Sequence, residues 1–67
     1  MNKIQEYRKR QKWTQEELTK RIGVERSAVA KWESGKSLPQ AAHLVKLAEI
    51  FGCSVDELLG RGKYYAR

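Results

Sequence analysis

The chain has 67 residues, enough for one small domain and close to the lower limit at which a single hydrophobic core is sufficient. Hydrophobic residues make up 40% and charged residues 33%, which fits a compact helical domain better than a disordered tail. A formal net charge of +6 favours a polyanionic partner, although a basic face kept for solubility would have the same charge.

Several classes of site are excluded by simple counts. The single cysteine, Cys53, cannot form an internal disulfide, and we expect it to be a small buried residue. His43 has no second metal-type ligand at helical spacing, so no metal or cofactor is expected. No signal-peptide pattern and no apolar run of about 18 residues occurs. We therefore expect a cytoplasmic protein with no membrane partner and no small-molecule ligand.

The basic charge is concentrated at the two ends of the chain. Residues 1–12 carry five basic side chains against Glu6, and residues 61–67 carry three more. Residues 38–60 are slightly acidic. We expect residues 1–60 to form the domain and residues 61–67 to be a short basic tail.

The first two predicted helices differ in how clearly their starts are marked. Residues 3–12 contain neither Gly nor Pro and form a weakly amphipathic helix. Its inner side carries Ile4, Tyr7 and Gln11. The second helix has the strongest start signal, because Thr14 is a good N-cap and Glu17 completes a capping box. It continues to about Ile22 and ends at Gly23, which takes a positive φ without steric cost.

A third helix must begin within about two residues of Gly23, because the stretch VERSAVAKWES returns to helical period. Gly35 ends it. Its inward face consists of Val24, Ala28, Val29 and Trp32. Its outward face consists of Glu25, Arg26, Ser27, Ala30, Lys31 and Ser34.

Two more helices follow Pro39. Residues 41–51 predict a fourth helix that is closed by Gly52. The residues expected to be buried by this helix are Ala41, Leu44, Val45, Ala48 and Phe51. Ser54 with Glu57 forms a second capping box and opens a short fifth helix. The residues expected to be buried by the fifth helix are Val55, Leu58 and Leu59. The fold class is therefore all-α, with five short helices around one core.

The second and third predicted helices, joined by a short turn at Gly23, have the spacing of a helix-turn-helix. The outward face of the third helix, with Arg26 and Lys31, can read base edges in a major groove. A plain helical hairpin within a bundle also explains the apolar positions, but it does not explain the positive outward face.

The tripeptide Gly35-Lys36-Ser37 has a second interpretation, because phosphate-binding loops carry the same three residues. Such a loop needs a glycine where this chain has Ala30, and it follows a strand. A helical pattern precedes it here, so a nucleotide loop is disfavoured.

The stretch TQEELTKRIGVERSAVAKWESGKSLPQAAHLVKLAEIFGCSVDELL, residues 14–59, resembles the Cro/lambda-repressor-like helix-turn-helix domain of the Xre family. The resemblance extends through YRKRQKW into the first helix and so covers nearly the whole chain. It implies a five-helix lambda-repressor-like domain that binds double-stranded DNA and regulates transcription, usually as a dimer on a pseudo-palindromic operator. A prokaryotic, phage or plasmid context is expected. Two residues depart from the family pattern, Glu25 in place of Ser or Thr and Thr19 in place of Ala.

The resemblance also implies roles for single residues. Glu33 pairs with Arg8 and so connects the third predicted helix to the first. Predicted phosphate contacts are Thr14, Gln15, Ser34 and Lys36. Predicted base contacts are Arg26, Ser27, Ala30 and Lys31. Arg26 suits a guanine through its bidentate fork, although a long side chain at a helix start also reaches the backbone. Ala30 suits a thymine methyl group.

Dimerisation needs a self-complementary apolar patch, which we expect near the C-terminus. The candidate residues are Val55, Leu58, Leu59, Tyr64 and Tyr65. Alternatively, Leu58 and Leu59 complete the core of the monomer. The preferred function is a homodimeric repressor. An antitoxin, a phage switch or a restriction-modification controller shares the fold, and a protein-interaction module without operator binding is a further alternative. No nucleophile–base pair or paired carboxylates suggest an enzyme.

Overall fold

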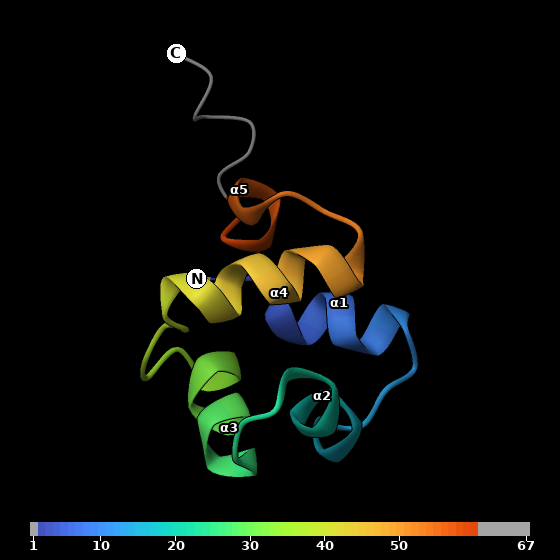
Figure 1. Cartoon of the computed structure of the whole chain (residues 1–67), viewed down its shortest axis with the longest axis vertical. Coiled ribbons are helices and arrows are strands. Elements are labelled where there is room, and N and C mark those ends of the chain that lie inside the picture. The colour runs from blue at the N-terminus through green and yellow to red at the C-terminus, as the bar shows by residue number, and fades with distance from the viewer. Residues whose placement is uncertain (1, 61–67) are drawn as a thin grey trace.

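The computed structural model describes residues 2–60, and the regular structure in this range is helical throughout (Figure 1). The helices are α1 (Ile4–Arg10), α2 (Gln15–Ile22), α3 (Arg26–Ser34), α4 (Ala41–Phe51) and α5 (Val55–Leu58). The predicted all-α, five-helix class is confirmed. The predicted basic tail, residues 61–67, lies outside the described residues.

Two helices in the middle of the molecule support the others. α4 crosses the centre, with α5 on one side and α1 on the other, while α2 and α3 lie together at the end away from α5 (Figure 1). α1 packs against both α3 and α4, and α2 packs against both α3 and α4. The α2–α3 pair is therefore displayed at one end of the molecule, on a base formed by α1 and α4.

All five helices contribute to one core. Its buried side chains are Ile4, Leu18, Ile22, Val29, Trp32, Leu47, Phe51 and Leu58. Aromatic rings extend it along α1 and α4: the Phe51 ring stacks on Tyr7 at 5.6 Å and on Trp13 at 5.9 Å between centroids. Such pairs add about 0.5–1.5 kcal/mol each beyond the burial of their area. The aromatic row therefore fixes the α1–α2 connection against the end of α4.

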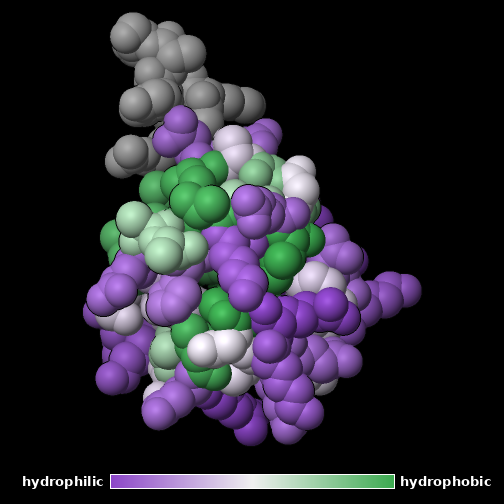
Figure 2. All heavy atoms as spheres, in the orientation of Figure 1, coloured by the Kyte–Doolittle hydropathy of each residue, from purple (hydrophilic) through white to green (hydrophobic). Residues whose placement is uncertain are grey.

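The prediction for the buried face of α4 is partly wrong. Ala48 and Phe51 are buried as expected, but Ala41 and Val45 are exposed, Val45 by 52%, and Leu47 is fully buried instead. Eight of the eleven residues of α4 are apolar, so its apolar side is wider than the face that packs, and helical period alone does not fix which part is buried. Packing against α1 and α5 selects the face with Leu47. The apolar side chains of α4 that do not pack in the core lie at the surface, over α4 and beside α5 (Figure 2).

The residues before α1 are tied to two other helices. The Asn2 side-chain amide donates a hydrogen bond to the Trp32 carbonyl at 3.0 Å, and its oxygen accepts one from the Ile4 N–H at 3.1 Å. The Lys3 N–H donates to the Leu58 carbonyl at 2.8 Å. The start of α1 is thereby joined to the last turn of α3 and to the end of α5.

α1 ends in a left-handed residue that is not glycine. Lys12 has φ 63°, and its N–H donates to the Lys9 carbonyl at 2.9 Å while the Trp13 N–H donates to the Arg8 carbonyl at 3.2 Å. These bonds close the helix in the manner of a Schellman motif. A β-carbon in this conformation costs about 1–2 kcal/mol.

Replacing Lys12 with glycine should therefore stabilise the protein. The relief of steric strain exceeds the extra chain entropy of glycine, about 0.5–1 kcal/mol, so a net gain of about 0.5–1 kcal/mol is expected. The matched control is Lys9→Gly, which removes the same charge inside α1 and should cost about 1 kcal/mol. Urea unfolding followed by circular dichroism measures both. A loss of stability in Lys12→Gly would contradict the strained conformation.

Candidate nucleic-acid interface

α2 begins with the predicted capping box. The Thr14 hydroxyl accepts a hydrogen bond from the Glu17 N–H at 3.0 Å, and the Glu17 carboxylate accepts one from the Thr14 N–H at 2.7 Å. The N–H groups of Gln15 and Glu16 lie in the first turn and have no partner within the helix. These groups, at the positive end of the helix dipole, are suited to an anion such as a DNA phosphate.

The turn between α2 and α3 has the conformation that Gly23 was predicted to allow. Gly23 has φ 85°, and its N–H donates to the Thr19 carbonyl at 2.8 Å. Thr19 sits where the family pattern has alanine, and its hydroxyl donates to the Gln15 carbonyl at 2.8 Å. Because this hydroxyl is satisfied within its own helix, threonine is tolerated where the two helices cross.

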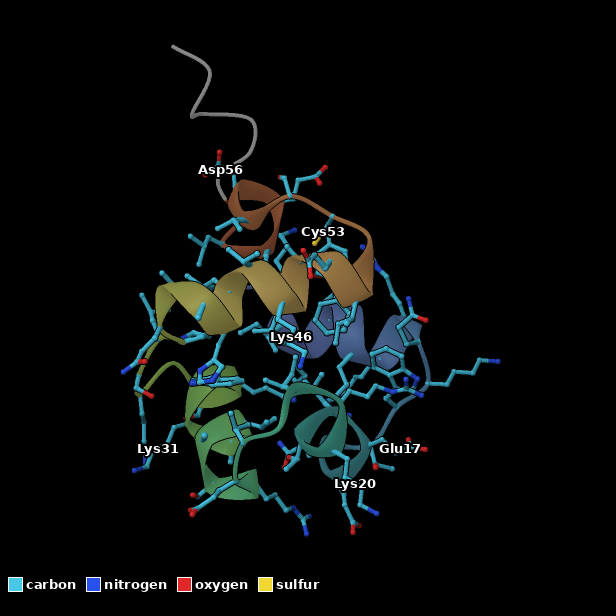
Figure 3. The ribbon with its side chains drawn as sticks, in the orientation of Figure 1. Glu17, Lys20, Lys31, Lys46, Cys53 and Asp56 are labelled. Carbon is cyan, nitrogen blue, oxygen red and sulfur yellow. The ribbon has the colours of Figure 1, made fainter. Side chains whose placement is uncertain are left out.

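α3 has a buried face and an exposed face. Val29 and Trp32 lie in the core. The four predicted base-contact residues are all exposed: Arg26, Ser27, Ala30 and Lys31. Their spacing places them on one side of the helix, and Lys31 points away from the other helices (Figure 3). The structure thus brings the predicted base contacts together on one free face.

The first turn of α3, where Glu25 replaces the Ser or Thr of the family pattern, lacks a side-chain cap. Glu25 is the N-cap residue, with φ −82° and ψ 154°, and its side chain accepts no hydrogen bond from the helix. Its carbonyl accepts the N–H groups of Ala28 at 3.0 Å and Val29 at 3.4 Å. The carboxylate contributes only its favourable interaction with the helix dipole.

The last turn of α3 explains the Gly-Lys-Ser stretch. Gly35 has φ 83° and donates its N–H to the Trp32 carbonyl at 3.2 Å. The N–H groups of Lys36 and Ser37 donate to the Lys31 carbonyl at 3.0 and 3.4 Å. Because these three N–H groups close a helix, they are not arranged as a phosphate cradle. The side chains of the predicted backbone contacts, Ser34 and Lys36, belong to exposed residues.

The predicted ion pair between Arg8 and Glu33 is present and nearly buried. Arg8 Nε lies 2.6 Å from Glu33 Oε2, and Arg8 Nη2 lies 3.1 Å from Glu33 Oε1. The Glu33 side chain is only 3% exposed. Arg8 Nη1 also donates to the Trp13 carbonyl at 2.6 Å. This two-pronged pairing joins α1, the α1–α2 connection and α3.

Sequence reasoning missed two further donors to the same carboxylate. Gln15 Nε2 lies 3.0 Å and Gln5 Nε2 lies 3.4 Å from Glu33 Oε1. Gln5 and Arg8 are three residues apart on α1 and therefore share a face. That spacing was the available signal for Gln5, whereas the contact of Gln15 depends on how α2 and α3 cross.

The predicted dimer residues do not form one available group. Leu58 is 0% exposed and lies in the core of this chain, so it is removed from the candidate dimer surface. Val55 and Leu59 are half-buried and keep some surface for a partner. Tyr64 and Tyr65 lie outside the described residues.

Cys53 and His43 both pack against other side chains of the domain. Cys53 is half-buried, and burial raises the pKa of its thiol. His43 lies against Trp32, with 5.6 Å between ring centroids. Across residues 2–60, no three His, Cys, Asp or Glu side chains are grouped so that they could hold a metal ion. The helices in this range are all too short or too polar to span a membrane.

Comparison with known proteins agrees with this geometry. A profile of the helix-turn-helix family HTH_3 matches residues 4–58. The chain is 40% identical over 57 residues to the HTH-type transcriptional activator BcrR of Enterococcus faecalis and 35% identical over 63 residues to the HTH-type transcriptional regulator AnsR of Bacillus subtilis. It is 42% identical over 48 residues to the cryptic phage CTXphi transcriptional repressor RstR of Vibrio cholerae.

These alignments cover 85%, 94% and 72% of the chain but only 28%, 54% and 43% of the three relatives. No solved structure gives a significant match. The fold and the exposed face of α3 define a DNA-binding helix-turn-helix domain. The chain belongs to the HTH_3 family, of the Cro/C1 (Xre) type, and the relatives named here are transcriptional regulators.

The uncapped start of α3 leads to a prediction. Glu25→Asp keeps the charge but shortens the side chain to a length that caps a helix, so the protein should gain about 1 kcal/mol of stability. The control Glu25→Gln adds no favoured cap and removes the charge at the helix start, so it should lose a few tenths of a kcal/mol. Urea midpoints measure both variants. Equal shifts in the two would contradict the assignment of Glu25 as an unused cap.

Proposed function

We propose that the chain is a sequence-specific transcriptional repressor that reads the major groove of duplex DNA with α3. The observation that supports this most directly is the exposed face of α3, which carries Arg26 and Lys31 on a helix whose opposite face is buried. A major groove about 12 Å wide admits an α-helix. At the edge of that face, the buried ion pair of Glu33 holds the helix to the rest of the domain.

The contacts divide into those that read sequence and those that position the protein. Arg26 and Ser27 lie in the first turn of α3, where side chains of a reading helix reach base edges. Ala30 offers a methyl group to thymine, and Lys31 adds a second cation on the same face. Phosphates are contacted by the start of α2, through Thr14 and Gln15 and the first-turn N–H groups, and by Ser34 and Lys36 after the reading face.

We further propose that the protein acts as a homodimer on a two-fold operator. One reading helix covers only a few base pairs, and two copies spaced by one DNA turn, about 34 Å, reach useful specificity. Val55 and Leu59 on α5 are the remaining described candidates for the contact between copies. A dimer bound over a promoter excludes polymerase by occupancy, and such a protein acts where a prokaryotic chromosome lies, in the cytoplasm.

Selection of binding sites from random duplexes should recover two inverted half-sites about one turn apart. The variant Arg26→Ala should keep its folding stability and lose about 1–3 kcal/mol of discrimination at one base pair in each half-site. The control Lys20→Ala removes an exposed cation from the last turn of α2 and should leave the preference unchanged. A pool with no enriched sequence would point to a protein-interaction module. An unchanged preference in Arg26→Ala would remove that residue from the base contacts.

The dimer is tested separately by sedimentation over a range of protein concentrations. Leu59→Glu should shift the equilibrium to monomer, because it places a charge in an apolar contact. The control Val45→Glu makes the same change on the exposed face of α4 and should leave association unaffected. A wild-type protein that stays monomeric at high micromolar concentration and protects a single half-site would contradict the dimer. Dissociation by Val45→Glu instead would move the contact to α4.

A further inference from the structure

Three donors meet at one oxygen of the buried Glu33 carboxylate. Oε1 accepts Arg8 Nη2 at 3.1 Å, Gln15 Nε2 at 3.0 Å and Gln5 Nε2 at 3.4 Å. Oε2 accepts Arg8 Nε at 2.6 Å. Two of these three residues belong to α1, but Gln15 is the first residue of α2. Gln15 therefore lies between the buried ion pair and the end of α2 that is suited to phosphate.

The Glu33 carboxylate determines which end of the Gln15 side-chain amide faces it. An ionised carboxylate only accepts hydrogen bonds, so the end of the amide that faces Glu33 must be the nitrogen. One N–H of this nitrogen is used by Glu33. The second N–H leaves the same nitrogen in a different direction, and the half-buried position of Gln15 keeps the residue in contact with solvent. A side chain held in this way has already lost the rotamer freedom that binding would otherwise remove.

We infer that Glu33 is a positioning residue for DNA binding, because it orients the Gln15 amide toward a DNA phosphate before the DNA arrives. The inference rests on the proposed DNA-binding function and deepens it. The ion pair with Arg8 holds Glu33, Glu33 holds Gln15, and Gln15 donates to the phosphate. The buried pair thus contributes to affinity through Gln15, in addition to orienting α3.

A double-mutant cycle isolates this effect from folding. Replacing one member of a buried ion pair leaves an unpaired charge, whereas replacing both by apolar residues of similar size is often neutral. Arg8→Met together with Glu33→Met deletes the acceptor for Gln15 and leaves the net charge of the protein unchanged. The cycle combines this pair with Gln15→Ala. Gln5→Ala is the matched control, since it removes another donor to the same oxygen from α1.

Affinity for one fixed duplex is measured by fluorescence anisotropy at several salt concentrations, with folding checked by circular dichroism. The methionine pair should weaken binding about three- to tenfold, the effect of one oriented hydrogen bond. In the Gln15→Ala background the same pair should cause a clearly smaller loss than in the wild type, because only its effect on the orientation of α3 remains, and Gln5→Ala should bind as the wild type does. Equal losses in both backgrounds, or full affinity in Gln15→Ala, would overturn the inference.

The salt dependence of binding by the wild-type protein distinguishes failure of this inference from failure of the proposed DNA-binding function. Its log–log salt dependence should have a slope of about −7 to −11 for a dimer that neutralises four to six phosphates per protomer. A flat dependence refutes DNA binding itself, whereas a steep slope with an additive cycle refutes only the role of Glu33. If the methionine pair does not fold, NMR of the wild-type Gln15 side-chain amide decides. One of its two N–H resonances should shift on adding duplex, and no shift in either would overturn the inference.

Discussion

The orientation of α3 depends on one buried carboxylate. Glu33 is almost wholly removed from water, so its charge requires the guanidinium of Arg8 and the amides beside it. An apolar pair of similar size would serve stability as well, since such ion pairs often add little net free energy. What the ion pair adds is a defined orientation of α3. The planar fork of Arg8 donates to the carboxylate in one geometry, and this fixes the angle and rotation of α3 relative to α1.

The polar contacts of α3 are concentrated at its end. The Trp32 carbonyl accepts the Asn2 amide, the next residue is Glu33, and Gly35 closes the helix. By contrast, the first turn is held by backbone bonds to Glu25 and by the burial of Val29. The helix is therefore firmly attached at the end farther from Arg26 and Ser27, two of the proposed base contacts. Burial in the hydrophobic core accounts for the formation of α3, and these polar contacts account for its orientation.

Local signals made most of the fold predictable. The capping boxes at Thr14 and Ser54 and the left-handed glycines depend on residues within one turn of each other, so the sequence alone indicates them. The buried face of α4 was not determined locally, because the apolar side of this helix is wider than the face that packs. The Arg8–Glu33 pair came from family resemblance. The spacing of Gln5 and Arg8 on α1 was a signal for Gln5, whereas the contacts of Gln15 and Asn2 depend on how the elements pack, which no spacing in the sequence describes.

The attachment of α3 at its end has a consequence for divergence within the family. Arg26, Ser27 and Ala30 are exposed, and Arg26 and Ser27 lie a full turn or more from the polar anchor at residues 32–35. These positions can accumulate substitutions without disturbing the core or the ion pair. On the proposed function, a gene duplicate can therefore acquire a new operator in few steps while it keeps its fold, and the two copies need not compete for the same DNA. The same separation makes this face a favourable place to exchange residues when a regulator with altered specificity is engineered.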